Sequence, residues 1–229
     1  MIGILGGMGT QAGLDFCNKL AIINRGKNDQ QYPLFLLYNK SNIPKRPENL
    51  KRYTNVLKSL VLGCQMLQKN NCKFIVMPCN TAHYWYDDLR KKIKIPIISM
   101  PKEVYIHTKK NCKKKSKIGI LCTEATLKTG VYNKYFDKTF ELVSPGKLLQ
   151  KKCVNKAIKF VKMGKVKQAE KALRPAVNYL MRIKCKKIIL GCTELPIAIF
   201  AFKSFKKIKQ SKIFLDPNYI LANAAMNKY

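Results

Sequence analysis

Two cysteines in this chain stand where a thiol could do chemistry. Cys79 occurs in Phe-Ile-Val-Met-Pro-Cys-Asn-Thr and Cys192 in Lys-Ile-Ile-Leu-Gly-Cys-Thr-Glu, so each follows a short apolar run and begins a polar turn. A short β-rich run bounded by Pro or Gly is typical of a buried strand. We therefore expect both thiols at the carboxyl ends of parallel strands, where open α/β sheets bind their ligands. Two facing thiols indicate proton transfer.

A thiolate and a thiol on opposite sides of a tetrahedral carbon can act in turn as base and acid. The thiolate removes a proton from one face while the thiol delivers a proton to the other, which inverts the centre without a cofactor. Because the α-proton of an amino acid is weakly acidic, the site must also stabilise charge on the substrate carboxylate. Asn80, Thr81 and Thr193 stand beside the two cysteines and supply hydrogen-bonding groups of the needed kind.

The chain also repeats itself. Met1-Ile2-Gly3-Ile4-Leu5 returns 116 residues later as Lys117-Ile118-Gly119-Ile120-Leu121, and the two cysteines lie 113 residues apart. Thr10 and Thr126 match at the first offset. Ile-Gly-Ile-Leu is an ordinary buried-strand sequence, but the shared order favours an internal duplication.

The duplication predicts the fold class and the domains. We expect two similar duplicated α/β domains with parallel-sheet cores, and an active site in the cleft between them. The first domain is predicted to be 1–100 and the second 101–215. A C-terminal helix, 216–229, has no counterpart in the repeat and is predicted to pack back on the first domain.

Local patterns predict the order of the elements. Strands are expected at 1–5, 33–38, 74–77, 95–100, 118–121, 140–143 and 188–190, and helices at 10–24, 50–68, 81–92 and 147–183. Polar turns are expected at 6–10 and 122–126, and a loop at 39–47. The Gly-rich turn after the first strand offers backbone N–H groups to an anion, and it fits a carboxylate because no dinucleotide or P-loop spacing follows.

His83 follows Cys79 by four residues, about one helical turn. A lone histidine is more often a capped or partly exposed surface residue than a catalyst, and orientation of the Cys79 loop is the alternative role. Cys122 is interpreted as structural, while Cys72 and Cys185 have no evident task.

Composition excludes several classes of protein. The nine cysteines lack zinc-binding spacings, so we expect neither a metal nor disulfides. No apolar run approaches a membrane span and no basic leader precedes the first strand, which predicts a cytoplasmic protein that does not enter a membrane.

The formal charge of +33 invites a nucleic-acid interpretation. However, only six of the 45 basic residues are Arg, and the lysines are spread over the predicted surface without a nucleic-acid-binding motif. We therefore interpret them as a solvated lysine-rich surface and do not expect a nucleic-acid partner. The electric field of such a positively charged surface still raises the local concentration of small dianions around the protein.

Five stretches of the chain resemble the pyridoxal-phosphate-independent aspartate/glutamate racemase family, most closely its aspartate racemase branch. They are Gly6-Gly7-Met8-Gly9, Ile43-Pro44-Lys45-Arg46, Cys79-Asn80-Thr81-Ala82-His83, Thr123-Glu124-Ala125-Thr126 and Gly191-Cys192-Thr193-Glu194-Leu195-Pro196. The resemblance implies a fold of two similar α/β domains, no metal or organic cofactor, and a homodimer.

The resemblance also implies roles for residues. Cys79 and Cys192 become the catalytic acid/base pair. The substrate-binding candidates are Met8, Arg46, Asn80, Thr81, Thr126, Lys162, Thr193 and Glu194. Lys165 is the nearest rival of Lys162. Where relatives have Gly, this chain has Ala125, with Glu124 beside it, which leaves the fine substrate preference open.

These observations predict an isomerase, an amino-acid racemase acting on a small acidic substrate, with aspartate first and glutamate second. An alternative keeps the fold and changes the reaction to that of a hydantoin racemase, a maleate isomerase or an arylmalonate decarboxylase. A third hypothesis is a lysine-rich nucleic-acid-binding protein on a retired enzyme scaffold, against which the two intact thiols argue.

Overall fold

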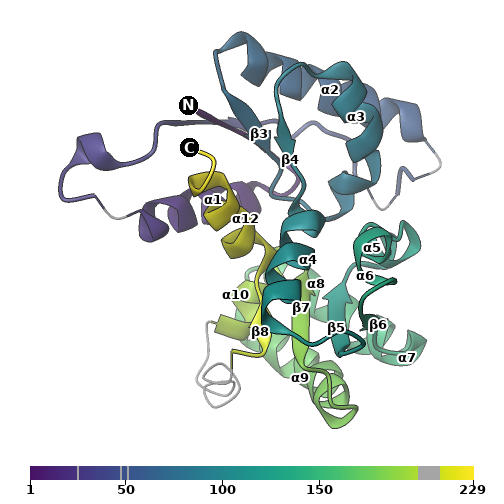
Figure 1. The fold of residues 1–229 in the computed structure, drawn as a ribbon. Coiled ribbons are helices and arrows are strands. Elements are labelled where there is room, and N and C mark those ends of the chain that lie inside the picture. The colour runs from purple at the N-terminus through teal and green to yellow at the C-terminus, as the bar shows by residue number, and fades with distance from the viewer. Residues whose placement is uncertain (25, 47, 51, 201–211) are drawn as a thin grey trace. The chain divides into compact units, whose positions relative to one another are not determined.

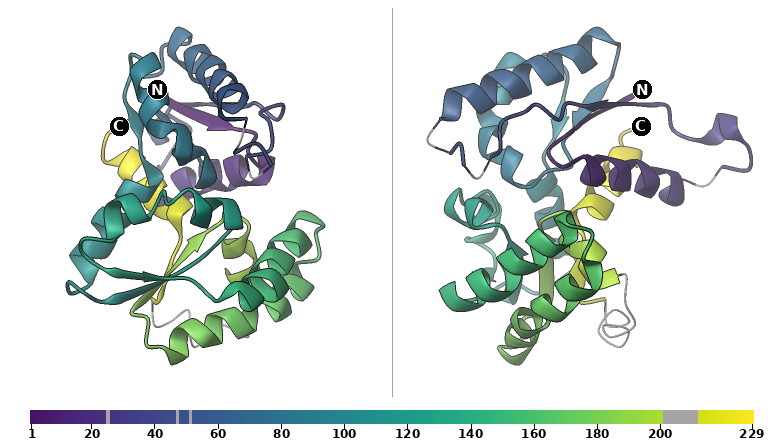
Figure 2. Two further views of the ribbon diagram at one scale, coloured as in Figure 1. Left: turned by 90° about the vertical axis from the view of Figure 1, so that its right-hand side faces the viewer. Right: turned by 180° about the vertical axis from the view of Figure 1, so that it is seen from behind.

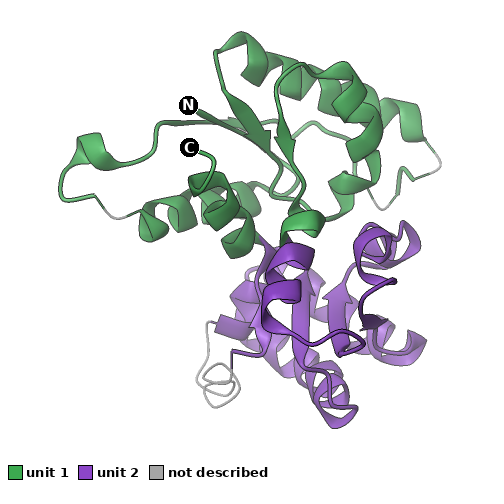
Figure 3. Cartoon of the chain, viewed as in Figure 1, with its two compact units in different colours: residues 1–103, 218–229 green, residues 104–217 purple. Residues whose placement is uncertain are grey.

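The chain divides into two compact units. The computed structural model describes all residues except 25, 47, 51 and 201–211. One unit comprises residues 1–103 and 218–229, and the other residues 104–217 (Figure 3). Pro47 of the expected loop, Lys51 of the expected helix 50–68 and residues 201–211 of the expected second domain lie outside the described residues. The domain limits expected from the sequence, 1–100 with 216–229 for the first domain and 101–215 for the second, remain predictions.

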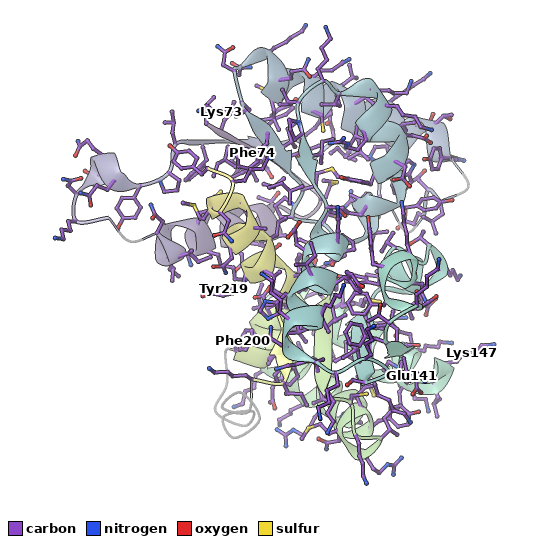
Figure 4. The ribbon with its side chains drawn as sticks, viewed as in Figure 1. Lys73, Phe74, Glu141, Lys147, Phe200 and Tyr219 are labelled. Carbon is purple, nitrogen blue, oxygen red and sulfur yellow. The ribbon has the colours of Figure 1, made fainter. Side chains whose placement is uncertain are left out.

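The first unit contains a four-stranded parallel sheet in the order β2-β1-β3-β4. Its strands are β1 (Ile2–Gly6), β2 (Phe35–Asn39), β3 (Phe74–Val76) and β4 (Ile97–Ile98) (Figure 1). Lys73 and Phe74, labelled in Figure 4, mark the start of β3. All residues of β1 and β3 are buried, as expected for central strands of a parallel sheet covered on both faces.

Helices cover both faces of this sheet. They are α1 (Thr10–Ile23), α2 (Tyr53–Lys69), α3 (Tyr86–Lys92) and α12 (Pro217–Met226), with 3₁₀ helices at Asp29–Gln31 and Thr81–Trp85. Leu5 of β1 packs with α2 and α3, whereas Ile2 and Ile4 pack with α1 and α12. In Figures 1 and 2, α12 (yellow) accordingly lies beside α1 (purple). Successive residues of β1 thus face opposite layers.

The second unit repeats the same topology, with strand order β6-β5-β7-β8, all parallel. The strands are β5 (Lys117–Cys122), β6 (Glu141–Val143), β7 (Lys187–Gly191) and β8 (Phe214–Leu215). The boundary between the two units in the sequence falls within α4 (Met100–Asn111), between Glu103 and Val104. The other helices of the second unit are α5 (Glu124–Lys128), α6 (Asn133–Phe136), α7 (Lys147–Leu149), α8 (Lys156–Lys162), α9 (Val166–Arg182) and α10 (Leu195–Phe200). The predicted pair of duplicated parallel-sheet α/β cores is therefore confirmed.

The duplication extends to the junction between helix and strand. Asn71 ends the α2 region with φ 58°, and Lys184 ends the α9 region with φ 62°. The residue after each turns back on its helix: the Cys72 N–H donates to the Leu67 carbonyl at 3.3 Å, and the Cys185 N–H to the Leu180 carbonyl at 3.1 Å. A left-handed residue followed by such a bond is a common helix ending.

These two cysteines have a packing task that the sequence did not reveal. A Cβ added to Gly3 would lie 3.1 Å from the Cys72 sulfur, and one added to Gly119 would lie 3.4 Å from the Cys185 sulfur. The missing side chains of the two glycines thus leave space that each thiol fills. Cys72 and Cys185 are 113 residues apart, as are Cys79 and Cys192.

Several predicted elements need correction. The expected helix 147–183 is interrupted, because a π-helical turn occupies Gln150–Asn155 and the chain reverses at Gly164, whose φ is +73°. The expected strand 95–100 shrinks to β4, since α4 already begins at Met100. β8 and α10 were not predicted. Within the described residues, no helix has the length and apolar character that a bilayer crossing needs.

Gly164 offers a test of the helix break. No atom lies within 4 Å of the position that a Cβ would occupy there, so only the left-handed backbone opposes a side chain. Gly164→Ala should lower the free energy of unfolding by about 1 kcal/mol in urea titrations. Gly146, equally open but with φ −57°, is the matched control, and Gly146→Ala should be neutral or slightly stabilising. Equal destabilisation by both variants would contradict this account.

Candidate active site

Both cysteines lie at the switch point of their own sheet. The chain passes from β1 to β2 on one side and then to β3 on the other side of β1, and β5, β6 and β7 follow the same course. In such sheets the crevice outside the carboxyl ends of the two central strands binds ligands. Cys79 follows β3 and Cys192 follows β7. Met8 follows β1, and Thr126 lies in α5 (Glu124–Lys128), the helix that follows β5, so each of them comes after one of the two central strands.

The segment after Cys79 is wound more tightly than expected. The sequence predicts an α-helix over 81–92, but Thr81–Trp85 form a 3₁₀ helix and α3 begins at Tyr86. Trp85 is fully buried, and its indole N–H donates to the Tyr53 carbonyl at 3.0 Å. This contact ties the end of the 3₁₀ helix to the start of α2, and short 3₁₀ segments are frequent at helix starts.

His83 is buried and makes a hydrogen bond with each ring nitrogen. Its Nε2 accepts the backbone N–H of Met100 at 3.0 Å, so the ring proton lies on Nδ1, which donates to the Cys79 carbonyl at 2.9 Å. The Tyr86 ring stacks on the imidazole with centroids 6.0 Å apart. Burial lowers the pKa of His83 to about 4, so the ring is neutral at neutral pH. His83 is therefore not the surface residue that its isolation in the sequence suggested.

The structure brings Met8 and Arg46 together. The Arg46 Nη2 donates to the Met8 carbonyl at 2.5 Å, and Nη1 donates to the carbonyls of Ile43 at 3.4 Å and Pro44 at 3.2 Å. Its buried Nε has no hydrogen-bond partner among the described residues. The guanidinium thus ties the loop after β2 to the Gly-rich turn after β1.

That turn depends on one glycine. Gly7 has φ +84°, and a Cβ there would lie 2.2 Å from the Lys40 carbonyl carbon, which no side chain can accommodate. The turn can therefore press against the chain that leaves β2. Asn80 and Thr81, the other candidates of the first unit, are both buried directly after Cys79.

Cys192 stands in an acidic setting. Its thiol donates to Glu194 Oε2 at 2.9 Å, and the Thr193 hydroxyl donates to the same oxygen at 3.3 Å. Lys162 Nζ lies 3.6 Å from Glu194 Oε1. Burial, and then the Glu194 charge, raise the pKa of Cys192 well above its ordinary value, so this cysteine holds its proton at neutral pH.

Three predicted site residues, Thr193, Glu194 and Lys162, are therefore gathered around one thiol. The pair between Lys162 and Glu194 favours Lys162 over Lys165, which lies beyond the end of α8 and precedes α9. Glu194 accepts hydrogen bonds from the Cys192 thiol and the Thr193 hydroxyl, while 15% of its side chain stays exposed.

Thr126 lies in a helix start and not in an open turn as expected. Thr123 is the N-cap of α5, and its hydroxyl oxygen accepts the Thr126 N–H at 3.2 Å. The two hydroxyl groups are 3.0 Å apart. The threonine side chain satisfies a free helix N–H, which explains why the predicted turn 122–126 already becomes helical at Glu124.

Gln150 is a residue of this region that sequence reasoning missed. It is buried, begins the π-helical turn, and donates through Nε2 to the Cys122 carbonyl at 2.9 Å and to Asn155 Oδ1 at 2.8 Å. Asn155 in turn donates to Glu124 Oε1 at 2.7 Å. Gln150 therefore connects the end of β5 to α5. Nothing in the helical pattern of 147–183 distinguishes this glutamine from an exposed one.

The side chains around the two cysteines provide thiols, hydroxyls and amides. Among the residues that the structure describes, no group of three or more His, Cys, Asp or Glu side chains is placed to hold a metal ion.

Solved structures share this two-unit fold. An aspartate racemase from Picrophilus torridus is 28% identical, with a TM-score of 0.84 over 99% of this chain and 93% of that chain. A glutamate racemase from Francisella tularensis, solved in complex with D-glutamate, is 20% identical, with a TM-score of 0.69 over 99% of this chain and 79% of that one. The second similarity shows the fold alone. The fold is that of a racemase.

Sequence comparison identifies the family. The Asp/Glu/Hydantoin racemase family model matches residues 5–225. A broad specificity amino-acid racemase from Bacillus subtilis (strain 168) is 26% identical over 236 residues, which cover 100% of this chain and 98% of that protein. The chain belongs to the Asp/Glu/Hydantoin racemase family. It is an amino-acid racemase and therefore an isomerase.

The acidic setting of Cys192 leads to a prediction. Glu194→Gln removes the charge that helps to raise the thiol pKa, so alkylation of Cys192 by iodoacetamide at neutral pH should become about tenfold faster, the effect of one pKa unit on a mostly protonated thiol. Peptide mass spectrometry would measure it.

Two controls accompany this measurement. Glu124→Gln changes a carboxylate that bonds Asn155 and should leave the alkylation of Cys192 unaltered. In the same digest Cys64, whose pKa burial raises to about 12, should stay unmodified. An unchanged rate for Cys192 in Glu194→Gln would show that burial alone keeps this thiol protonated.

Proposed function

We propose that this racemase interconverts L- and D-aspartate without a cofactor, using Cys79 and Cys192 as its two acid/base groups. The observation that supports the proposal most directly is the repeated position of the thiols. Each follows the third strand of its own unit and lies at the switch point of that sheet. Each half of the duplicated fold thus contributes one group able to transfer a proton.

The reaction needs the two thiols in opposite protonation states. In one direction the Cys79 thiolate takes the α-proton, and the electron pair of the broken C–H bond passes into the carboxylate-stabilised carbanion. The Cys192 thiol, which rests protonated beside Glu194, then gives its proton to the opposite face and becomes the thiolate. The reverse direction starts from the Cys192 thiolate and the Cys79 thiol. The proposal requires both sulfurs to reach opposite faces of one α-carbon.

An acidic substrate fits the cationic groups among the site candidates. Arg46 can bind the side-chain carboxylate of a substrate if its guanidinium gives up one of its hydrogen bonds to a main-chain carbonyl. We expect it to give up the longest of these bonds, the one of 3.4 Å to the Ile43 carbonyl. Lys162 is exposed for 62% of its side chain and holds a further positive charge near Cys192. The full-length similarity to an aspartate racemase supports the same choice.

A wider substrate range is the second candidate. It is favoured by the full-length similarity to a relative named a broad specificity amino-acid racemase. Glutamate, one methylene longer than aspartate, is the nearest further substrate. A panel of amino acids in the same assay separates a narrow from a wide preference.

Other expectations about the enzyme stay predictions. They are the homodimer, the cytoplasmic location, and the absence of a cofactor, a metal and a nucleic-acid partner. None of them enters the argument for proton transfer, which needs only the two thiols and a substrate.

The central test follows the α-proton and the chirality together. The reduced protein is incubated with each L-amino acid in D₂O, and α-deuteration is measured by NMR while the D-enantiomer is measured by chiral chromatography. Aspartate should gain deuterium and racemise. If no amino acid exchanges its α-proton, the proposed function is wrong.

Substitution of either thiol should separate exchange from racemisation. Cys79→Ser and Cys192→Ser should each reduce racemisation by at least about 10³-fold, because a hydroxyl yields little alkoxide at neutral pH. Each variant should still exchange the α-proton of the single enantiomer that its remaining thiol deprotonates. Cys112→Ser, at a partly exposed cysteine outside the site, is the matched control and should keep full activity. Unimpaired racemisation in Cys79→Ser would end the two-thiol mechanism.

Arg46 can be tested with two substrates. Arg46→Lys should reduce aspartate turnover by roughly 10- to 100-fold, because Lys cannot reproduce the planar fork of donors. The slow racemisation of alanine, which has no side-chain carboxylate, should change little. Lys114→Gln, at an exposed lysine, serves as the control for the general positive field. Equal losses for aspartate and alanine would mean that Arg46 holds the loop and does not read the substrate side chain.

A further inference from the structure

The two thiols differ in how the sheet holds them. Cys192 directly follows Gly191, which is still paired with Cys122 of β5, and the Cys192 carbonyl accepts the Leu195 N–H at 3.0 Å. Cys79 comes three residues after Val76, the last paired residue of β3. Cys79 therefore lies farther from the paired strands than Cys192, and its N–H donates to the Met77 carbonyl of the same loop at 2.7 Å. An anchoring contact from outside the loop is needed to hold this loop against the rest of the unit.

His83 supplies that anchor. The Cys79 carbonyl accepts the Nδ1 proton of His83 at 2.9 Å, and the other ring nitrogen accepts the Met100 N–H at 3.0 Å. Met100 begins α4, so its N–H is one of those that the helix cannot pair internally. One buried imidazole thus connects the Cys79 loop to a helix start that the chain reaches only after β4.

The equivalent position in the second unit has no histidine. The residue 113 positions after His83 is Pro196, which lies in α10 and has no side-chain donor or acceptor. The unit of Cys192, which directly follows a paired strand, therefore has no imidazole at this position. The unit of Cys79, which lies three residues beyond its strand, has His83 there.

Resting on the proposed two-thiol reaction, we propose that His83 is a positioning residue that holds the Cys79 loop against the start of α4 and so keeps this thiol in line with the α-carbon. The ring neither touches the substrate nor transfers a proton. A histidine suits this role because its rigid neutral ring carries one donor and one acceptor on different sides, which lets it reach the Cys79 carbonyl and the Met100 N–H together.

The first experiment reads the ring directly and does not depend on activity. The chain has only two histidines, His83 and His107, so a two-bond ¹H–¹⁵N correlation spectrum of the wild-type protein resolves both imidazoles. His83 should show the Nδ1–H tautomer and keep it as the pH falls to about 5.5, because its pKa lies near 4. His107→Gln assigns the signals. An Nε2–H tautomer, or protonation of His83 near its ordinary pKa, would overturn the proposal.

The second experiment separates the two hydrogen bonds. The amide of Asn can replace Nδ1 and that of Gln can replace Nε2, so His83→Asn keeps the bond to Cys79 while His83→Gln keeps only the bond to Met100. His83→Ala keeps neither and should lose on the order of 100-fold in kcat with aspartate, with little change in KM. His83→Asn should retain most of kcat, and His83→Gln should resemble His83→Ala. His107→Gln, at an exposed histidine, should leave both constants unchanged.

The isotope pattern provides a readout that general loss of stability cannot imitate. In His83→Ala, Cys192 can still remove a proton, so one enantiomer should exchange its α-proton in D₂O faster than it racemises. In the wild type, the rate of exchange should not exceed the rate of racemisation for either enantiomer. Equal kcat in the Asn, Gln and Ala variants, or exchange and racemisation falling together for both enantiomers, would refute the positioning role. If the wild type itself exchanges no α-proton, the proposed function fails, while the tautomer measurement still decides whether the anchor exists.

Discussion

The parallel pairing of β1 with β3, and of β5 with β7, determines where both thiols stand. Strands that run in parallel bring their carboxyl ends to one edge of the sheet, and the loops that follow them meet there. The pairing is tight because Gly3 and Gly119 have no side chains and Cys72 and Cys185 pack into the space. A shift of the register would move these contacts and the position of each catalytic candidate together.

The two halves place their thiols alike but surround them differently. The Cys79 loop is held by a neutral ring, whereas Cys192 donates to a carboxylate that a lysine partly balances. A racemase of the proposed kind needs one thiolate and one thiol at a time, so an environment that keeps Cys192 protonated is compatible with its use first as an acid. The repeated topology places the two thiols alike, whereas the residues beside each cysteine set the different charges.

The high positive charge acts at a different range from these contacts. The formal charge of +33 raises the concentration of small dianions around the protein, but it cannot orient a substrate within the site. Orientation requires directional contacts at hydrogen-bond distance, of the kind that Arg46 makes with the Met8 and Pro44 carbonyls of the protein itself. This difference in range explains how a lysine-rich surface and a specific site can coexist in one protein.

The sequence by itself determined the two sheets, the duplication and the two cysteines, because apolar runs, glycine turns and repeated offsets are local signals. Only the tertiary structure decided the 3₁₀ winding at His83, the tautomer of its ring, the place of Gln150, and the ion pair of Lys162 with Glu194. His83 meets Met100 17 residues away, and Gln150 meets Cys122 28 residues away. Such partners leave no local pattern, since a hydrogen bond across the fold depends on where the backbone returns and not on the residue types beside it.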